Sequence, residues 1–143
     1  MKNLLIDQLK RDEGFSDKMY KDTVGVWTIG YGTNLDIGIS EEEAEYLLQN
    51  RVNKVIDSAE EKFSWFKDLS LPRQAVVINM VYNLGIEGFS KFNVTIDSIS
   101  KGRYEEAAKH MMDSKWATQV KGRARRLAEQ MKLDKWVIDD AGN

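Results

Sequence analysis

The longest uninterrupted helical pattern in this chain covers residues 41–63. It opens with Ser40 and Glu43, a serine followed three residues later by a glutamate, which is the signature of a capping box. About 23 residues at roughly 1.5 Å each give a helix roughly 35 Å long, which suits a rod between two lobes. Its apolar positions keep helical spacing throughout: Ala44, Leu48, Val52, Val55, Ile56, Ala59 and Phe63.

The part of the chain after this rod predicts a helical lobe over about 70–138. The only proline, Pro72, stands where a helix begins. The run AVVINMVYNLG that follows it is apolar on nearly all sides, so this helix is expected at the buried centre of the lobe. Three further helical segments are expected at about 90–101, 103–117 and 122–136.

The part before the rod predicts a helix and then a β-hairpin. The helix covers 3–13, with Ile6 and Leu9 on one face, and Gly14 ends it. The runs SDKMYKD and GVWTIGYG are strand-like, and Asp22 followed by Gly25 fits a type I turn closed by a left-handed glycine. The sequence therefore predicts one α+β, mostly helical domain over 1–143, with a hairpin lobe at about 14–40, the linker helix at 41–63, and helix 3–13 packed on the helical lobe.

Composition excludes several classes of protein and site. The 143 residues include no cysteine and only one histidine, so we expect no disulfide, no metal and no cofactor. A net charge of −2 argues against a general nucleic-acid binder. No apolar run approaches a membrane span, and the start MKNLLIDQLKRDEGF is not a signal peptide. We expect a monomer that is made and kept in the cytoplasm, without membrane insertion.

Glu13 is the first candidate for chemistry. It lies seven residues after Ile6 and four after Leu9, so it continues the inward face of the predicted helix. Burial disfavours the charged form of a carboxyl group, so a glutamate there keeps its proton near neutral pH. A protonated carboxyl is what a general acid needs. The alternative without a function is that Glu13 is an exposed acidic residue at the end of a helix, as its neighbour Asp12 is expected to be.

Asp22 and Thr28 carry little information singly. Aspartate is favoured at the first position of a type I turn, and threonine is common in strands. Together they lie near the mouth of one hairpin, where a carboxylate and a hydroxyl can hold one water between them. With Glu13 across a cleft, the arrangement is that of a glycosidase, in which one carboxyl group is neutral and the other ionised.

These residues also carry a family resemblance. The stretch E-G-x5-Y-x-D-T-x-G-x-x-T-I-G-Y-G, from Glu13 to Gly32, resembles the catalytic region of phage-type lysozymes. These are the endolysins of glycoside hydrolase family 24, typified by the T-even phage lysozyme. The similarity continues in order through INMVYNLG, GFSKF, RYEEAA, SKW and GRARR, and so covers nearly the whole chain.

The resemblance implies a muramidase that cleaves the β-1,4 bond from N-acetylmuramic acid to N-acetylglucosamine in peptidoglycan. The catalytic residues of the family fall on Glu13, Asp22 and Thr28. We expect an inverting single displacement that lyses the host, with the protein held in the host cytoplasm until its release. Peptidoglycan glycan strands are then the partner. The implied substrate-binding positions are Asn34, Tyr82, Thr95 and His110, and the implied supporting positions are Arg123 and Asn83.

The chain also departs from the T-even pattern. The segment TNLDIGISEEEA after Gly32 is much shorter, so the first lobe is expected to lack part of the sheet. Thr33 stands where that enzyme has a histidine, so any ion pair made by the histidine is absent. The acidic overall charge predicts weaker attraction to an anionic cell wall.

Three other functions stay open at this point. A lytic transglycosylase needs the glutamate but no partner that holds water, and its product lacks one water. A non-catalytic wall-binding module would keep the fold without the reaction. A nucleic-acid patch on GRARR and the preceding Lys121 is the third, although only four clustered basic side chains support it.

Overall fold

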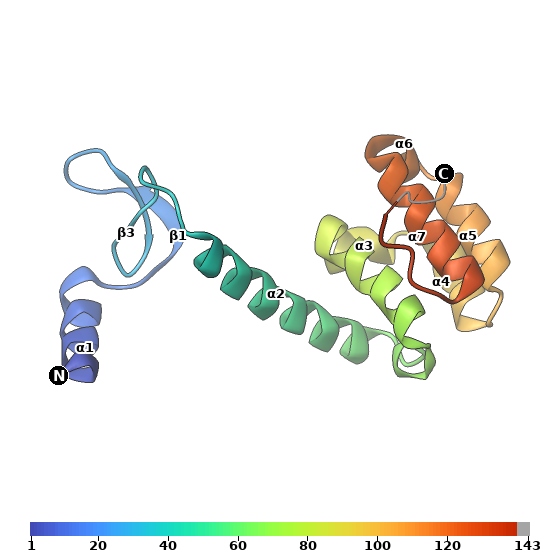
Figure 1. The fold of residues 1–143 in the computed structure, drawn as a ribbon, viewed down its shortest axis with the longest axis horizontal. Coiled ribbons are helices and arrows are strands. Elements are labelled where there is room, and N and C mark those ends of the chain that lie inside the picture. Colours follow the sequence, from blue (N-terminus) through green and yellow to red (C-terminus); the bar gives the residue numbers. More distant parts are fainter. Residues whose placement is uncertain (140–143) are drawn as a thin grey trace. The chain divides into compact units, whose positions relative to one another are not determined.

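The computed structural model describes residues 1–139, and the chain divides within helix α2 into two compact units, 1–47 and 48–143. The N-terminal unit contains helix α1, the three strands and the start of α2, and the C-terminal unit contains the remaining helices (Figure 1). The fold is α+β and mostly helical, as predicted. The elements are α1 (Lys2–Glu13), β1 (Ser16–Lys21), β2 (Trp27–Gly30), β3 (Thr33–Asn34), α2 (Glu41–Lys62), a 3-10 turn η1 (Phe66–Asp68), α3 (Leu71–Ser90), α4 (Asn93–Ser100), α5 (Tyr104–Met112), α6 (Lys115–Val120) and α7 (Gly122–Leu133).

The N-terminal unit is built on a small antiparallel sheet of order β1-β2-β3. The predicted hairpin is present, and its turn closes as expected: the Gly25 N–H donates to the Asp22 carbonyl at 3.1 Å, and Gly25 has a φ of 87°. The third strand was not predicted, because two residues are too few to show strand periodicity. Helix α1 ends at Gly14, whose φ of 70° stops the helix.

Helix α2 begins with the predicted capping box. The Ser40 N–H donates to the Glu43 carboxylate at 2.9 Å, and the Glu43 N–H donates to the Ser40 hydroxyl at 3.1 Å. These two bonds satisfy backbone donors that the first turn of a helix leaves unpaired. They also hold the pKa of the Glu43 carboxyl below its usual range, chiefly through the backbone N–H of Ser40.

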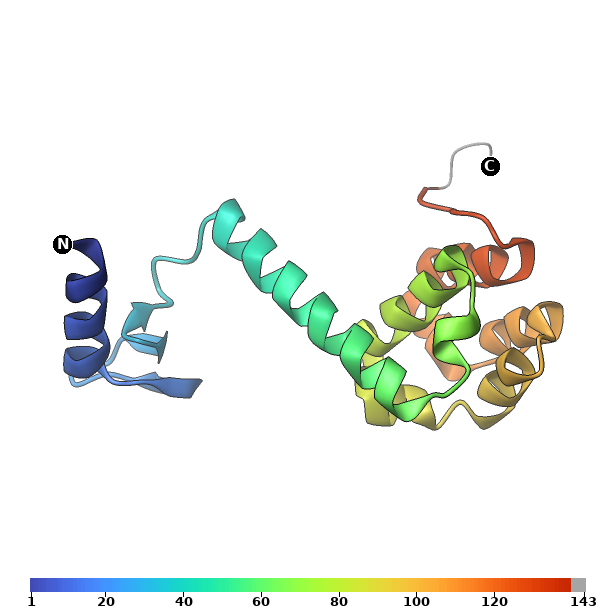
Figure 2. The same cartoon turned by 90° about the horizontal axis from the view of Figure 1, so that it is seen from below.

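The core of the C-terminal unit lies around α3, as predicted. Val76, Val77 and Met80 on this helix are buried with Phe89, and α7 packs against both α3 and α5. In both views the α3 ribbon, green to yellow, lies beside the red α7 ribbon (Figures 1 and 2). No helix among residues 1–139 is both long enough and apolar enough to cross a membrane.

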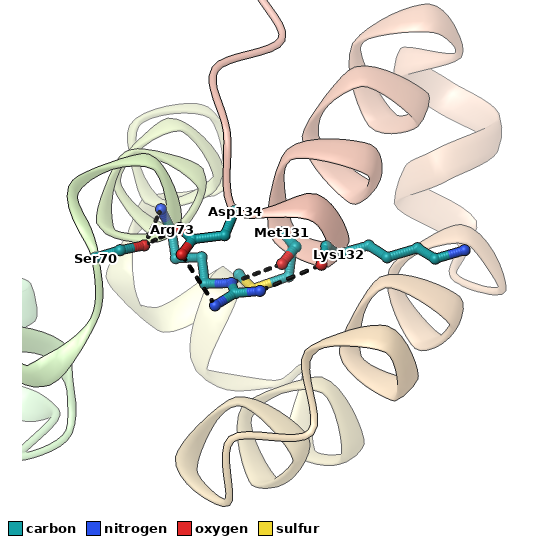
Figure 3. Close-up of polar contacts among 5 residues, drawn as sticks. All are labelled: Ser70, Arg73, Met131, Lys132 and Asp134. Carbon is teal, nitrogen blue, oxygen red and sulfur yellow. Dashed lines mark hydrogen bonds and ion pairs between the residues drawn. The ribbon is translucent and has the colours of Figure 1, made fainter.

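A polar clamp joins the start of α3 to the end of α7 (Figure 3). The Arg73 guanidinium donates to the carbonyl oxygens of Met131 at 2.8 Å and Lys132 at 3.2 Å, and it pairs with Asp134 at 3.5 Å. It therefore caps carbonyls that the last turn of α7 leaves unpaired. The hydroxyl of Ser70, the N-cap of α3, donates to the same Asp134. The clamp fixes α7 on α3, and these two helices carry Arg123 and Tyr82.

Two helix predictions were wrong in their extent. The segment expected at 103–117 is two helices, because Ser114 begins a new one: its hydroxyl accepts from the Ala117 N–H at 3.3 Å. The helix expected at 122–136 ends at Leu133, because Asp134 adopts a left-handed conformation with a φ of 57°. Helix α3 is interrupted at Gly85, where φ is 78°.

Candidate active site

The carboxylate of Asp22 is oriented by the turn that it begins. Its Oδ1 accepts the backbone N–H groups of Val24 and Val26, both at 2.9 Å. This side chain-to-backbone pattern is why aspartate suits the position. Within the described residues Oδ2 receives no hydrogen bond, so one oxygen holds the turn and the other is left for chemistry.

Thr28 is the only buried side chain in the N-terminal unit, at 4% exposure. It lies opposite Tyr20 on β1 and opposite Asn34 on β3. Opposed residues of antiparallel strands share a face of the sheet, so Tyr20, Thr28 and Asn34 lie on one face. Asp22 comes two residues after Tyr20 and therefore lies on the same side. The Thr28 hydroxyl donates to the Val26 carbonyl at 2.9 Å, so its oxygen remains able to accept a hydrogen bond.

Glu13 is the last residue of α1, and its side chain lies across Gly32, between β2 and β3. A β-carbon placed on Gly32 would fall 2.7 Å from the Glu13 carboxyl carbon. The N-terminal unit therefore locates Glu13 against the end of the strand that carries Thr28. Glu13 is exposed, however, so this unit does not supply the burial expected from its position on the helix.

Asn34 is fixed through its side-chain oxygen, which leaves its amide nitrogen available. Its Oδ1 accepts the backbone N–H of Asp36 at 2.8 Å, which fixes the side chain through its oxygen. The NH₂ group makes no hydrogen bond with a residue in the described part of the chain, and it can donate to a sugar oxygen.

In the C-terminal unit Arg123 is held by a residue to which the sequence analysis gave no role, Asn79. The Nε and Nη2 groups of Arg123 donate to the Asn79 side-chain oxygen at 2.9 and 2.7 Å, and Nη2 also reaches the Asn79 carbonyl at 3.3 Å. Arg123 is therefore held in one orientation and is not simply solvated. Its Nη1 group takes no part in the hydrogen bonds to Asn79. An asparagine inside the apolar run of α3 was the signal that could have identified this pair.

Tyr82 is not a core residue, although its helix is largely buried. It is 43% exposed and lines two hollows in the C-terminal unit. One, of about 620 Å³, also has Asn79 and Arg123 in its wall. The other, of about 510 Å³, lies between α2 and α3. An exposed aromatic ring above such hollows can pack against a sugar.

Thr95 and His110 come together in a third hollow of about 590 Å³. Thr95 forms part of its floor, at 1% exposure, and His110 is half-buried. Trp116 lines the same hollow, and its indole N–H donates to the Asn83 side-chain oxygen at 2.9 Å. Asn83 thus supports a wall of this cavity through Trp116.

The candidate residues are therefore divided between the two units. The N-terminal unit holds Glu13, Asp22, Thr28 and Asn34, and the C-terminal unit holds Tyr82, Asn83, Thr95, His110 and Arg123. Across residues 1–139 no three histidine, cysteine or acidic side chains are grouped as metal ligands.

Comparison with known proteins identifies the family of the chain. Residues 10–130 match the family model described as phage lysozyme. A probable T4-type lysozyme of Dictyostelium discoideum is 30% identical over 85% of this chain and 89% of its own length. An endolysin of Acyrthosiphon pisum secondary endosymbiont phage 1 is 29% identical over 76% of this chain and 74% of its own. The pre-baseplate central spike protein Gp5 of Enterobacteria phage T4 is 29% identical over 86% of this chain, but over only 26% of its own length. The chain therefore belongs to the phage lysozyme family, a family of peptidoglycan hydrolases.

Proposed function

We propose that this phage-type lysozyme hydrolyses the β-1,4 bond between N-acetylmuramic acid and N-acetylglucosamine in bacterial peptidoglycan, by an inverting single displacement. One observation carries the proposal: a single small sheet carries Thr28, Asp22 directly follows its first strand, and the Glu13 side chain lies over Gly32, between its second and third strands. Two carboxyl groups and no metal are sufficient for glycoside hydrolysis, since one protonates the leaving oxygen and the other activates a water.

Glu13 is the general acid of the proposed reaction. It gives its proton to the glycosidic oxygen while the bond from that oxygen to the anomeric carbon breaks. The contact with Gly32 supports this role because the absence of a side chain there lets the carboxyl group lie beside the end of β2.

Asp22 and Thr28 position the attacking water in the proposed reaction. The free Oδ2 of Asp22 accepts one water proton as general base, while the Thr28 oxygen accepts a hydrogen bond from the other. Since the Thr28 proton is already donated to Val26, this hydroxyl acts towards water as an acceptor. Both water protons are then held, and a lone pair is left to attack the anomeric carbon.

Arg123 is proposed to face Glu13 through the part of its guanidinium that Asn79 does not use. This role depends on the predicted packing of helix α1 on the helical lobe. Its apolar side chains Leu5, Ile6 and Leu9 favour such packing, since each is 43% exposed. A guanidinium beside the acid would orient it and stabilise its carboxylate after the proton has been transferred.

The substrate is proposed to contact Asn34, Tyr82, Thr95 and His110. The exposed ring of Tyr82 supports a stacking contact with a sugar, and the free amide of Asn34 supports a hydrogen bond. The hollow lined by Thr95 and His110 supports a further sugar position.

Muropeptide analysis of a peptidoglycan digest tests the reaction. Hydrolysis should leave reducing N-acetylmuramic acid ends with the mass of one added water. Products that lack this water would make the protein a lytic transglycosylase. Binding to cell walls without any cleavage would make it a wall-binding module.

Early proton NMR of a cleaved glycan tests the stereochemistry. A water between Asp22 and the sugar gives the α-anomer first, before mutarotation mixes the two forms. The β-anomer first, or a sugar ester trapped on Asp22, would show that Asp22 attacks the sugar directly.

We further propose that the protein stays in the host cytoplasm until release and then lyses the cell. Intracellular production should leave cells intact until the inner membrane is permeabilised. Since one relative is a central spike protein, delivery from outside is the alternative, and clearing of intact cells by added protein would favour it.

A further inference from the structure

Two side chains from different parts of the N-terminal unit contact one aromatic ring beside the proposed acid. The ring belongs to Tyr31, which lies between β2 and β3 and directly precedes Gly32. The ammonium group of Lys10, on α1, lies over this ring at 5.5 Å from its centre. The ring of Phe15, just before β1, lies 5.4 Å from the same centre at an interplanar angle of 52°. We call Lys10, Phe15 and Tyr31 the Tyr31 cluster, and all three lie within the unit 1–47.

Both contacts in the cluster have the geometry of attractive interactions. A cation within about 6 Å of a ring centre is attracted by the negative face of the ring. Two tilted rings whose centres are roughly 4.5–7 Å apart also attract each other. Phe15 and Tyr31 are opposed positions on neighbouring strands, since Ser16 pairs with Gly30 in the same ladder. The register of β1 on β2 therefore brings the two rings together.

The Tyr31 cluster brackets Glu13 along the chain. Lys10 comes three residues before Glu13, in the last turn of α1, and Phe15 comes two residues after it. Tyr31 is bonded to Gly32, over which the Glu13 carboxyl group lies. The end of α1 is therefore attached to the turn between β2 and β3 on both sides of the proposed acid.

This attachment lies at the surface of the N-terminal unit. Tyr31 is 46% exposed and Phe15 is 67% exposed, so neither ring belongs to a buried core. Thr28 is the only buried side chain among residues 1–47, so the sheet has little core of its own that could hold α1 in place. The position of the end of α1 therefore depends on surface contacts such as those with Tyr31.

We propose that Tyr31 is a positioning residue, which holds the end of α1 through Lys10 and Phe15 so that Glu13 stays over Gly32. The inference rests on the proposed function, because Tyr31 acts through the proposed acid. A loosely held α1 would let the carboxyl group move away from the glycosidic oxygen, and a shift of about 1 Å can cost on the order of 10²-fold in rate. Loss of the Tyr31 ring should therefore lower kcat, whereas loss of a substrate contact would raise KM.

The test measures kcat and KM of variants on purified peptidoglycan strands. Tyr31→Ala should lower kcat at least about tenfold and change KM by less than about twofold. Tyr31→Phe should keep kcat near the wild-type value, because it keeps the ring and removes only a hydroxyl that makes no hydrogen bond with a residue among 1–139. The matched control is Tyr46→Ala, which removes a 73% exposed tyrosine on α2 in the same unit and should change neither constant.

Lys10→Met tests the contact from the other side. It removes only the cation and should lower kcat roughly two- to fivefold, as expected for an exposed contact of this kind. Adding Lys10→Met to Tyr31→Ala should cause no further loss, because both changes remove the same contact. Lys10 is exposed, so Lys10→Met carries the test even if Tyr31→Ala does not fold.

Three kinetic results would overturn the inference. A raised KM with unchanged kcat in Tyr31→Ala would make Tyr31 a substrate contact. An equal loss of kcat in Tyr31→Phe would assign the role to the hydroxyl, and wild-type constants in both Tyr31→Ala and Lys10→Met would leave the cluster without a role.

Proton NMR reports the position of the acid without catalysis. Nuclear Overhauser effects between the Glu13 γ-protons and the Gly32 α-protons are expected from their contact. They should weaken in Tyr31→Ala and persist in Tyr31→Phe and Tyr46→Ala, and their persistence in Tyr31→Ala would refute the inference. If they weaken as expected but the wild type cleaves no glycan, the muramidase proposal fails and the role of Tyr31 in placing Glu13 stands.

Discussion

The side chain of Glu13 lies directly over the α-carbon of Gly32. A β-carbon at position 32 would fall 2.7 Å from the carboxyl carbon of Glu13, closer than real side chains approach, and 3.0 Å from its γ-carbon. Gly32 also has a φ of 73°, which favours glycine. The absence of a side chain at position 32 thus determines where the proposed acid can lie.

Gly32→Ala should reduce lysis at least about tenfold while leaving the protein folded. Because Glu13 is exposed, its flexible side chain can rotate away from the added methyl group, so the carboxyl group is displaced and the fold is kept. A misplaced catalytic group costs on the order of 10²-fold in rate when the shift is about 1 Å. Lysis rates and thermal unfolding of the purified variant measure the two effects.

Gly30→Ala is the matched control for this prediction. Gly30 has a similar φ of 67°, but a β-carbon there would meet nothing within 4 Å. The two variants should therefore lose similar stability, on the order of 1–2 kcal/mol for an alanine in the left-handed region. If Gly32→Ala were as active as Gly30→Ala, the contact would have no catalytic role.

Glu13→Gln should reduce lysis at least about 10²-fold with little change in unfolding temperature. Glutamine fills the same space over Gly32 and keeps hydrogen-bonding capacity, but it cannot protonate the leaving oxygen. Asp12→Gln is a suitable control, since Asp12 is exposed and precedes Glu13 on the same helix. Near wild-type lysis by Glu13→Gln would remove the general-acid assignment.

Asp22→Asn and Asp22→Ala should separate the two roles of this carboxylate. Asparagine can keep the oxygen that accepts the Val24 and Val26 N–H groups, so the turn should stay stable while the base is lost. Alanine removes both functions and should also lower the free energy of unfolding by about 1–3 kcal/mol. Equal stability of the two variants, measured by urea unfolding, would contradict the division of labour between Oδ1 and Oδ2.

Asn79→Ala and Arg123→Ala should both alter the pH dependence of lysis. A cation beside a carboxylic acid favours the carboxylate, so removing or misdirecting it should move the alkaline limb of the pH–rate profile to higher pH. Asn79→Ala keeps the positive charge of Arg123 and removes only the hydrogen bonds that orient it. The alkaline limb should therefore shift less in Asn79→Ala than in Arg123→Ala. Arg103→Ala removes an exposed cation elsewhere and should not shift the limb. Profiles of all three variants that superimpose on wild type would make the Asn79–Arg123 pair purely structural.

The start of α2 should lose stability in acid through Glu43. The hydrogen bonds from Ser40 lower the pKa of this carboxyl in the folded state. Its contribution is therefore complete above the ordinary glutamate value and disappears as pH falls through the lowered folded value. Glu43→Gln should flatten this dependence, whereas Glu42→Gln, which leaves the capping box intact, should not. NMR titration of the Ser40 amide resonance reports the bond directly, and a resonance unmoved by acid would contradict it.

Short-range pattern by itself determined much of this protein. The capping box at Ser40, the end of α1 at Gly14 and the turn from Asp22 to Gly25 depend on hydrogen bonds and φ angles within a few residues, and all three are present. The order and type of the longer elements also followed from periodicity, as did the central place of α3 in the core of the C-terminal unit. The assignment of Glu13, Asp22 and Thr28 to one reacting site remains a prediction that the variants above test.

Only the tertiary structure decided where side chains far apart in the chain meet. Asn79 holds Arg123 across 44 residues of sequence, Gly32 receives Glu13, and Tyr82 is exposed on a helix whose pattern suggested burial. Helix α7 ends where Arg73, at the start of another helix, caps its last carbonyls. Periodicity shows which face of an element is apolar. It does not show which polar groups of other elements will lie opposite that element, because those contacts depend on how the elements pack together.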